Sequence, residues 1–203
     1  MFVLDWMTKE VVTVSRDDSI ENLTSIMNSK KINHLPVVAD KKLVGIITRS
    51  DIRQALTSIK FDKTKSRVND FMTREVLTVK EYDTLEDVLL LIYDKKIGAL
   101  PVTDNDNNLI GIITRHDILK GFIKIIGLNE KGSTILLKIK DTPEELERII
   151  HTLNKTKCKI LSFFTLVKGK KNRLISVRLD CINKIFIEEL FISEGFEIYI
   201  PWK

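Results

Sequence analysis

The sequence has few of the residues that mark disulfide-rich or membrane-spanning proteins. It contains only two cysteines, Cys158 and Cys181, and they form no Cys-x-x-Cys pair, so we interpret them as reduced thiols rather than as a disulfide or a metal pair. No apolar run approaches the roughly 20 residues of a membrane helix. We also expect no secretory signal at the N-terminus, and therefore a cytoplasmic protein.

Short catalytic motifs are missing as well. There is no Gly-x-Ser-x-Gly, no His-Glu-x-x-His and no phosphate-binding loop of the Gly-x-x-x-x-Gly-Lys-Ser/Thr type. The three histidines, His34, His116 and His151, lack the spacing of metal ligands. We therefore expect neither an enzyme nor a metal site, and no cofactor.

The net charge of +5 is confined to the C-terminal part of the chain. Residues 1–121 hold 18 basic and 18 acidic side chains, whereas residues 122–203 hold 15 and 10. This asymmetry permits binding to nucleic acid or to an acidic partner. Lys168, Lys170 and Lys171, however, surround Gly169 in an expected hairpin turn, where lysines are commonly just solvated.

An internal repeat of about 65 residues dominates the sequence. Three segments recur: VLDWMTKEVVTV (3–14) as VNDFMTREVLTV (68–79), KKINHLPV (30–37) as KKIGALPV (95–102), and LVGIITRSDI (43–52) as LIGIITRHDI (109–118). Such a long period in only two copies indicates paired half-domains rather than a solenoid. Two similar halves packed face to face would create two related clefts, where we expect a ligand.

Each repeat has the pattern β-α-β-β-α. The first has an extended segment at 11–14, a helix from Ile20 capped by Asp18-Ser19, strands at 35–38 and up to Thr48, and a helix at 50–59; the second has counterparts at 76–79, from Leu85, at 100–103, up to Thr114, and at 116–126. With its closing Gly-Val/Ile-Ile-Thr-x-x-Asp, this α/β plan closely resembles the CBS domain, and the tandem resembles a Bateman module. We expect repeats at 1–59 and 68–126 joined by a polar linker at 60–67.

Residues 132–203 follow a different pattern. We expect a strand at 133–140, a helix from Thr142-Pro143 with the apolar face Leu146, Ile149, Ile150 and Leu153, strands at 159–167 and 173–181, a helix at 185–193, and a strand at 196–200. This β-α-β-β-α-β order is ferredoxin-like α+β and resembles an ACT domain. The whole domain order resembles the bacterial acetoin-utilisation regulatory proteins.

The resemblance to ACT domains has one departure. Where many of them carry a glycine that lets an amino-acid ligand approach the backbone, this chain has Glu144 after Asp141-Thr142-Pro143. We therefore expect this domain to serve dimerisation or signal output rather than to bind amino acids.

Two Thr-x-x-Asp motifs, Thr48 with Asp51 and Thr114 with Asp117, stand where an apolar strand passes into a helix. Such an aspartate can accept hydrogen bonds from the two hydroxyls of a ribose, while the helix N-terminus attracts phosphate. The same pattern is also an ordinary capping box. Two copies in a CBS-like frame favour nucleotide binding.

The resemblance to CBS pairs implies that each cleft combines both repeats. The first would join Thr48 and Asp51 to Val76, Leu77, Thr78, Gly98 and Ala99; the second would join Thr114, Arg115, His116 and Asp117 to Val11, Val12, Thr13, Asn33 and His34. His34 stands where some CBS domains place a phosphate-contacting basic residue, although it could equally be a locally bonded strand-edge histidine. We expect the second cleft to bind phosphate better, and Gly98-Ala99 to leave room for a bulkier ligand in the first.

These patterns predict a regulatory protein that senses an adenine nucleotide in its CBS clefts. We also expect a homodimer, because the short helices carry apolar residues beyond the needs of a small core: Ile52, Ala55, Leu56, Ile118, Leu119 and Phe122. Two alternatives stay open. The module could be purely structural with helix-capping motifs, or the basic C-terminal domain could bind nucleic acid, although it lacks an RNA-recognition aromatic motif.

Overall fold

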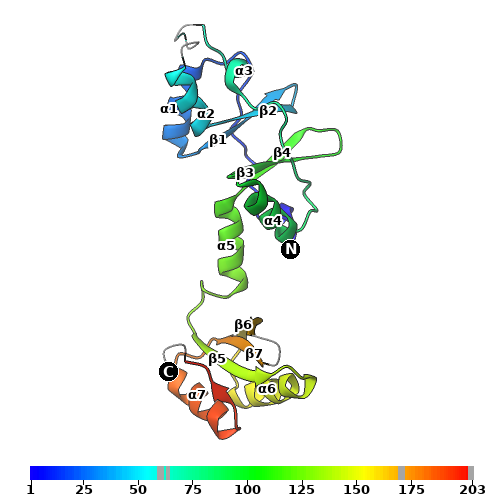
Figure 1. Ribbon diagram of the computed structural model, residues 1–203, viewed down its shortest axis with the longest axis vertical. Coiled ribbons are helices and arrows are strands. Elements are labelled where there is room, and N and C mark those ends of the chain that lie inside the picture. Colours follow the sequence, from blue (N-terminus) through cyan, green and yellow to red (C-terminus); the bar gives the residue numbers. More distant parts are fainter. Residues whose placement is uncertain (59–61, 63–64, 169–171, 201–203) are drawn as a thin grey trace. The chain divides into compact units, whose positions relative to one another are not determined.

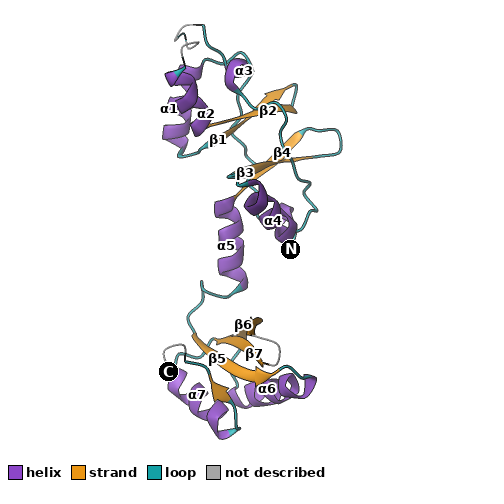
Figure 2. Cartoon of the chain, in the orientation of Figure 1, coloured by secondary structure: helices purple, strands orange, loops and turns teal. Residues whose placement is uncertain are grey.

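The computed structural model describes residues 1–58, 62, 65–168 and 172–200 (Figure 1). The chain divides into two compact units, Met1–Leu119 and Lys120–Lys203, and both mix helices with strands (Figure 2). Among the described residues, no helix is both long and apolar enough to cross a membrane. The linker residues 60, 61, 63 and 64 and the expected turn at Gly169 lie outside the described residues.

The first unit contains the two predicted repeats except for the end of the last helix, which crosses the boundary after Leu119. The first repeat consists of α1 (Ile20–Lys30), β1 (His34–Ala39), β2 (Lys42–Thr48) and α2 (Arg49–Thr57), and the second of α4 (Leu85–Lys95), β3 (Ala99–Thr103), β4 (Leu109–Thr114) and α5 (Arg115–Ile125). β1 pairs with β2 and β3 with β4, both antiparallel and in equivalent registers that set His34 opposite Thr48 and Ala99 opposite Thr114. The predicted α-β-β-α order is thus confirmed, whereas the extended segments at 11–14 and 76–79 form only single parallel bridges, Val14 with Val37 and Val79 with Val102.

The apolar residues that recur periodically in the first helix are buried. Ile20, Leu23 and Met27 of α1 join Leu35 and Ile47 of the strands in one cluster of the first repeat. These side chains recur at the three- and four-residue spacing that keeps them on one helix face. The cluster fixes α1 and the β1–β2 pair, and thereby the position of the turn that enters α2.

The opening segment of each repeat pairs with the last strand of the other repeat. Thr8 forms a β-bridge with Ile112 of β4, and Thr73 forms one with Ile46 of β2. Glycine makes this approach possible: a Cβ on Gly111 would lie 2.5 Å from the Met7 sulfur. A Cβ on Gly45 would similarly lie 2.7 Å from the sulfur of Met72, the counterpart of Met7. The exchange brings residues of both repeats together around each cleft.

Two short helical turns were not predicted: η1 (Val3–Asp5) and α3 (Val68–Phe71). In each, an aspartate three residues after the N-cap residue accepts a hydrogen bond from the amide of that residue. The Asp70 carboxylate accepts a hydrogen bond from the Arg67 amide at 2.9 Å, and Asp5 accepts one from the Phe2 amide at 3.4 Å. They are too short to show a helical period, so only the repeated aspartate could have indicated them.

Three of the six apolar residues assigned to a dimer face are buried within the chain. Ile52 and Ala55 of α2 and Ile118 of α5 are 0–3% exposed, so that part of the expectation is wrong. Leu56 and Leu119 do remain exposed, at 49% and 57%. The helices α2 and α5 therefore bury more of their apolar residues within the chain than we expected from the sequence.

The second unit is a four-stranded sheet covered by two helices. Its elements are β5 (Ser133–Lys140), α6 (Pro143–Thr156), β6 (Ile160–Lys168), β7 (Asn172–Leu179), α7 (Lys184–Ser193) and β8 (Glu197–Ile198). The sheet order is β6-β7-β5-β8, with every neighbouring pair antiparallel. Ile149 of α6 and Phe191 of α7 join Leu137 of β5 in one core cluster, so both helices cover the same sheet face.

Several details of this unit differ from the predictions. β8 covers only Glu197–Ile198 instead of residues 196–200. Leu146 and Ile150 are exposed, because α6 turns Thr152 and Thr156 inward with Ile149 and Leu153 instead. Thr142 precedes the helix as predicted, but its side chain accepts no capping hydrogen bond from the backbone.

Phe163 and Phe164, the two neighbouring aromatic residues of β6, lie on opposite faces of the sheet and so do not form together the stacking platform that the nucleic-acid alternative needs. Phe163 pairs with Val177 and packs against the core, whereas Phe164 pairs with Ser176 on the other face. Because side chains alternate between the two faces along a strand, neighbouring residues of β6 point in opposite directions.

Candidate functional site: two clefts between the repeats

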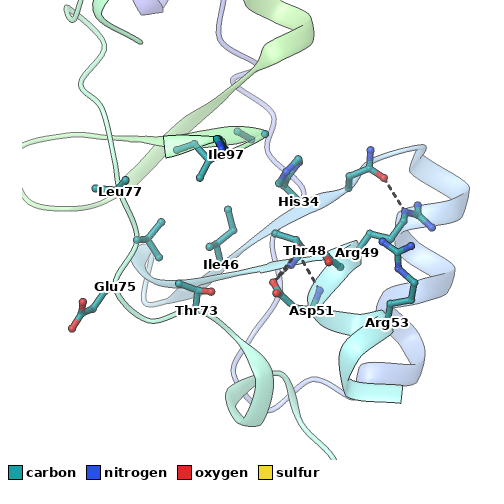
Figure 3. A pocket seen from close by; sticks show the side chains of 16 residues that line it. His34, Ile46, Thr48, Arg49, Asp51, Arg53, Thr73, Glu75, Leu77 and Ile97 are labelled. Atoms are coloured by element: carbon teal, nitrogen blue, oxygen red, sulfur yellow. Dashed lines mark hydrogen bonds between the residues drawn. The ribbon is translucent and has the colours of Figure 1, made fainter. Parts of the chain in front are cut away.

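The first cleft, with a volume of about 580 Å³, lies between the β2–α2 turn and the segment that opens the second repeat. In Figure 3, Leu77 and Glu75 lie across the cleft from Asp51 and Arg53. The lining residues are Asn33, His34, Ile46, Thr48, Arg49, Ser50, Asp51, Arg53, Thr73, Glu75, Val76, Leu77, Lys96, Ile97, Gly98 and Ala99. The structure thus brings together all residues predicted for this cleft except Thr78.

The second cleft is the counterpart of the first, with a volume of about 540 Å³. Its lining residues are Thr8, Glu10, Val11, Val12, Lys31, Ile32, Asn33, His34, Gly98, Ile112, Thr114, Arg115, His116 and Asp117. All residues predicted for it are present except Thr13. Asn33, His34 and Gly98 line both clefts, which the sequence did not indicate.

Each Thr-x-x-Asp motif forms a complete capping box at a helix start. The Thr48 amide and the Thr48 hydroxyl both donate to Asp51 Oδ2 at 2.8 Å, while the Asp51 amide donates to Thr48 Oγ1 at 3.2 Å. The three corresponding distances for Thr114 and Asp117 are 3.0, 2.7 and 3.3 Å. The capping interpretation is therefore correct as far as it goes.

Capping uses only one of the two carboxylate oxygens of each aspartate. Both bonds that each carboxylate accepts use Oδ2, and within the described part of the chain Oδ1 of Asp51 and of Asp117 accepts no hydrogen bond. Since a carboxylate has about four acceptor positions, each cleft keeps an oriented acceptor at its wall. The threonine hydroxyl has already donated its only proton, so toward a ligand it can only accept.

The wall opposite the first motif carries polar main-chain groups. Val76 and Leu77 precede the bridge at Val79, and across the described residues their amides and carbonyls make no hydrogen bond within the chain. Val12 in the second cleft is in the same situation. Backbone groups of a folded protein rarely stay unpaired, so these are satisfied by water or by a ligand.

His34 forms the wall that the two clefts share. A Cβ on Gly98 would lie 2.6 Å from His34 Nε2, so the imidazole packs directly against the glycine backbone. Burial lowers the pKa of His34 below its usual 6.5, and the charge of Arg115 lowers it further, while Asp51 acts in the opposite direction. The imidazole is therefore neutral at neutral pH.

Two expectations change as a result. His34 supplies no positive charge for a phosphate at neutral pH, because its environment disfavours the imidazolium. The room expected above Gly98 for a bulkier ligand is filled by the His34 ring. Gly98 is needed for that ring and not for the ligand.

The arginines of the two clefts differ in how far they are engaged. Arg49 donates to the side-chain oxygens of Asn33 and Asn28 and to the Ile32 carbonyl. Arg115, its counterpart, donates through Nε to the Ile97 carbonyl. Arg53 also lines the first cleft, and in the described part of the chain no hydrogen bond or ion pair engages its guanidinium.

The charged residues that sequence reasoning missed are mostly repeated ones. Lys31 and Lys96 end α1 and α4 in the left-handed conformation, with φ of 54° and 55°, and each lines a cleft. Glu10 and Glu75 are another such pair. Their recurrence at the repeat offset of about 65 residues was a usable signal. Arg53 gave none, because the second repeat has Leu119 in its place.

Comparison with protein families matches the CBS domain to residues 3–58 and 68–124, which is more than half of the chain. The chain belongs to the CBS domain family. This agrees with the duplicated clefts and with the exchanged opening segments.

Among curated proteins, this CBS pair is similar to an inosine-5'-monophosphate dehydrogenase of Methanocaldococcus jannaschii, at 40% identity over 69% of this chain and 27% of the enzyme. It is also similar to a homoserine O-acetyltransferase of Methanohalobium evestigatum, at 35% identity over 58% of this chain and 23% of the enzyme. The chain thus spans about a quarter of the length of these relatives. Shared CBS regions account for such matches to enzymes.

Solved structures show the same fold for about 60% of the chain. The CBS pair of protein MJ0100, in complex with 5'-methylthioadenosine and S-adenosylmethionine, is 34% identical over 60% of this chain and 95% of its own, with a TM-score of 0.54. CBSX2 in complex with AMP is 31% identical over 61% and 97%, with a TM-score of 0.56. A Vibrio cholerae protein assigned to acetoin utilization (AcuB) is 28% identical over 64% and 95%, with a TM-score of 0.58. CBS pairs related to this one therefore bind adenosine-containing ligands.

Proposed function

We propose that this protein is a regulatory sensor that binds an adenine nucleotide of the AMP, ADP or ATP class in the two CBS clefts. One observation carries the proposal. In both clefts, a carboxylate with an unengaged oxygen stands at a helix N-terminus, opposite a segment with unpaired main-chain groups. This set provides acceptors for ribose, donors and acceptors for a base edge, and a dipole that favours phosphate.

The dimensions and the walls fit such a ligand. Volumes of about 580 and 540 Å³ lie within the roughly 300–1,000 Å³ of small-molecule sites. Ile46 and Val76 in the first cleft, and Ile112 and Val12 in the second, supply apolar surface for a purine ring. The adenosine-type ligands of MJ0100 and CBSX2 support the ligand class.

The first cleft is the better candidate for the phosphate. Two arginines, Arg49 and Arg53, line the first cleft, whereas Arg115 alone lines the second among its described residues. Leu119 stands in the second repeat where the first has Arg53. Guanidinium groups bind phosphate through several parallel hydrogen bonds. Because His34 is neutral at neutral pH, it does not reverse this difference. Our proposal therefore differs from the expectation that the sequence suggested.

Calorimetric titration tests the binding function. AMP, ADP, ATP and adenosine are titrated separately into ligand-stripped protein, with GMP as the control base. We expect saturable binding of at least one adenine nucleotide and weaker binding of GMP. Absence of binding by all four adenine compounds, in protein that melts cooperatively, would favour the purely structural alternative.

Arg53→Leu, which copies the second repeat, tests the phosphate assignment. We expect it to weaken AMP binding about tenfold, the loss of one charge-assisted hydrogen bond, while the affinity for adenosine stays within about twofold. The reciprocal variant Leu119→Arg is the matched control for the second cleft. Equal losses for AMP and adenosine would contradict a phosphate role.

For the C-terminal unit we propose an ACT-like domain that serves dimerisation or signal output. The support is its element order and its β6-β7-β5-β8 sheet. Hydrogen bonds from its own amide and from Thr142 lower the pKa of Glu144. This carboxylate therefore already occupies the start of α6, which argues against capture of an amino-acid carboxylate there.

The proposal also includes a homodimer and a cytoplasmic location. Exposed Leu56 and Leu119 supply apolar surface for contact between copies. Adenine nucleotides are ligands of the cell interior, which suits a cytoplasmic sensor. The bound state would act by its different affinity for two conformations of the pair, as any regulatory ligand must.

A further inference from the structure

The two cysteines of the chain meet in the C-terminal unit, outside the clefts. β6 and β7 pair with Ile160 opposite Leu179, and continuing this register toward the strand ends sets Cys158 opposite Cys181. The intervening pair confirms the alignment, because the Asp180 amide donates to the Lys159 carbonyl at 3.1 Å. The Lys159 amide in turn donates to Asp180 Oδ1 at 2.8 Å.

The two thiols lie near each other. The Cys181 thiol is close enough to raise the pKa of Cys158, and both side chains pack against the same core cluster. Both are free and only partly buried, so a small reagent can reach them. Neither has a strong partner elsewhere: Cys158 Sγ is 3.4 Å from the Thr156 carbonyl and Cys181 Sγ is 4.0 Å from the Asn183 carbonyl.

Position along the strands favours a covalent link. Residues directly opposite each other in an antiparallel pair, away from the mutual hydrogen bonds, have Cα atoms about 4.5 Å apart, at the short end of the disulfide range of about 4.4–6.8 Å. Cys158 and Cys181 lie just beyond the ends of β6 and β7, and because the Asp180 amide still bonds the Lys159 carbonyl, an extension of the register by one pair would set them in such a position.

We infer that Cys158 and Cys181 form a redox-active dithiol that closes to an intramolecular disulfide in exchange with a low-molecular-weight disulfide. One cysteine loses its proton and its thiolate attacks the reagent, which forms a mixed disulfide and releases one reagent thiolate. The second cysteine, deprotonated in turn, attacks the protein sulfur of that mixed disulfide and releases the second reagent thiolate. Two protein thiols are oxidised and one reagent disulfide is reduced to two thiols.

The link would join the end of α6 to the start of α7. Cys158 follows the α6 cap residue Lys157, and Cys181 precedes Asn183, whose side chain caps α7 by accepting from the Phe186 amide at 3.1 Å. Closing the β6–β7 hairpin would restrict the unfolded chain and stabilise the oxidised form. Burial and the nearby Cys181 thiol raise the pKa of Cys158, which makes its reaction slow near neutral pH.

The experiment incubates the full-length protein with glutathione buffers of rising oxidised-to-reduced ratio. Remaining thiols are then trapped with an alkylating reagent, and the intact mass and the linked peptides are measured. We expect both thiols to disappear together. The linked peptides should contain Cys158 and Cys181 joined by a disulfide within one polypeptide. Stable mixed disulfides with glutathione, cross-linked dimers, or two alkylatable thiols in fully oxidised buffer would each overturn the inference.

Thermal melting of the same samples gives a second, independent result. Oxidation should raise the Tm of the wild-type protein by several degrees, and Cys158→Ser and Cys181→Ser should each abolish that rise. Both variants keep a small side chain with a hydrogen-bonding atom, so they serve as matched controls for each other. An equal rise in either variant would show that oxidation acts elsewhere.

Discussion

Replacing Asp51 by asparagine separates the two roles of this carboxylate. An asparagine side-chain oxygen can keep both hydrogen bonds that Asp51 Oδ2 accepts from Thr48, and so keep the cap. The other side-chain atom, which faces the cleft, changes from a charged acceptor to an amide donor. A ribose hydroxyl would then lose its charge-assisted hydrogen bond while the helix start stays formed.

The expected magnitudes differ clearly. Loss of the charge-assisted hydrogen bond costs about 1.5–3 kcal/mol, which is roughly a ten- to hundredfold weaker Kd. Asp51→Ala removes the cap as well, at a further cost of about 0.5–2 kcal/mol in the free energy of unfolding. The assay is calorimetric titration with AMP, combined with thermal melting in the absence of ligand.

Asp87 serves as the control, because it is a helix-capping aspartate outside the clefts. The Thr84 hydroxyl donates to Asp87 Oδ2 at 2.6 Å and the Asp87 amide donates to Thr84 Oγ1 at 3.1 Å, so α4 begins with two of the three bonds of the Thr48–Asp51 box. Asp87 lines neither cleft. Asp87→Asn should therefore leave AMP affinity unchanged. If Asp51→Asn also leaves the affinity unchanged while Asp51→Ala only lowers the Tm, the aspartate is a cap and nothing more.

Three further outcomes follow from the clefts and the helices. Gly98→Ala should cost about 1–3 kcal/mol in unfolding free energy, because the new Cβ meets His34 at 2.6 Å; His34→Ala should recover most of that loss, and an unaffected Gly98→Ala Tm would contradict this packing. Since the pKa of His34 is lowered in the folded state, the unfolded chain binds its proton first, and stability should fall as pH drops below 6.5; His34→Gln should flatten that decline in pH-dependent melts, and identical profiles would refute it. Leu56→Glu should dissociate the dimer or unfold it, as light scattering would show, whereas a stable wild-type monomer well above micromolar concentration would exclude the dimer.

The sequence predicted most of the fold where a pattern occurred twice, although the repeated segments 11–14 and 76–79 form only single bridges and no strands. Each expectation for the Thr48 turn was supported by its counterpart at Thr114, and both turns form as capping boxes. The order of elements along the C-terminal unit was also predictable, in part from the alternation in β6 and β7. What failed were lone edges: β8 is shorter than expected, and Leu146 and Ile150 stay in solvent because α6 rotates its threonines inward.

The shared wall of the clefts was beyond prediction. That His34 lies against Gly98 depends on how the two β-pairs approach each other, and no spacing in the sequence encodes that distance. The charge state of His34 depends in turn on burial and on Arg115, which is distant in the sequence. Arg53 escaped attention because it breaks the repeat. Unique residues in a duplicated chain carry the asymmetry between its sites, and repetition cannot reveal them.

The most direct test of the account is an NMR titration of isotopically labelled protein with AMP. The claim is that the ligand lies between the repeats, so its contacts must come from both. We predict saturable shifts of the Thr48 and Asp51 amides together with those of Val76 and Leu77 on the opposite wall, with the Asp87 amide unmoved. Shifts confined to one repeat, to the C-terminal unit, or absent at millimolar AMP would contradict it.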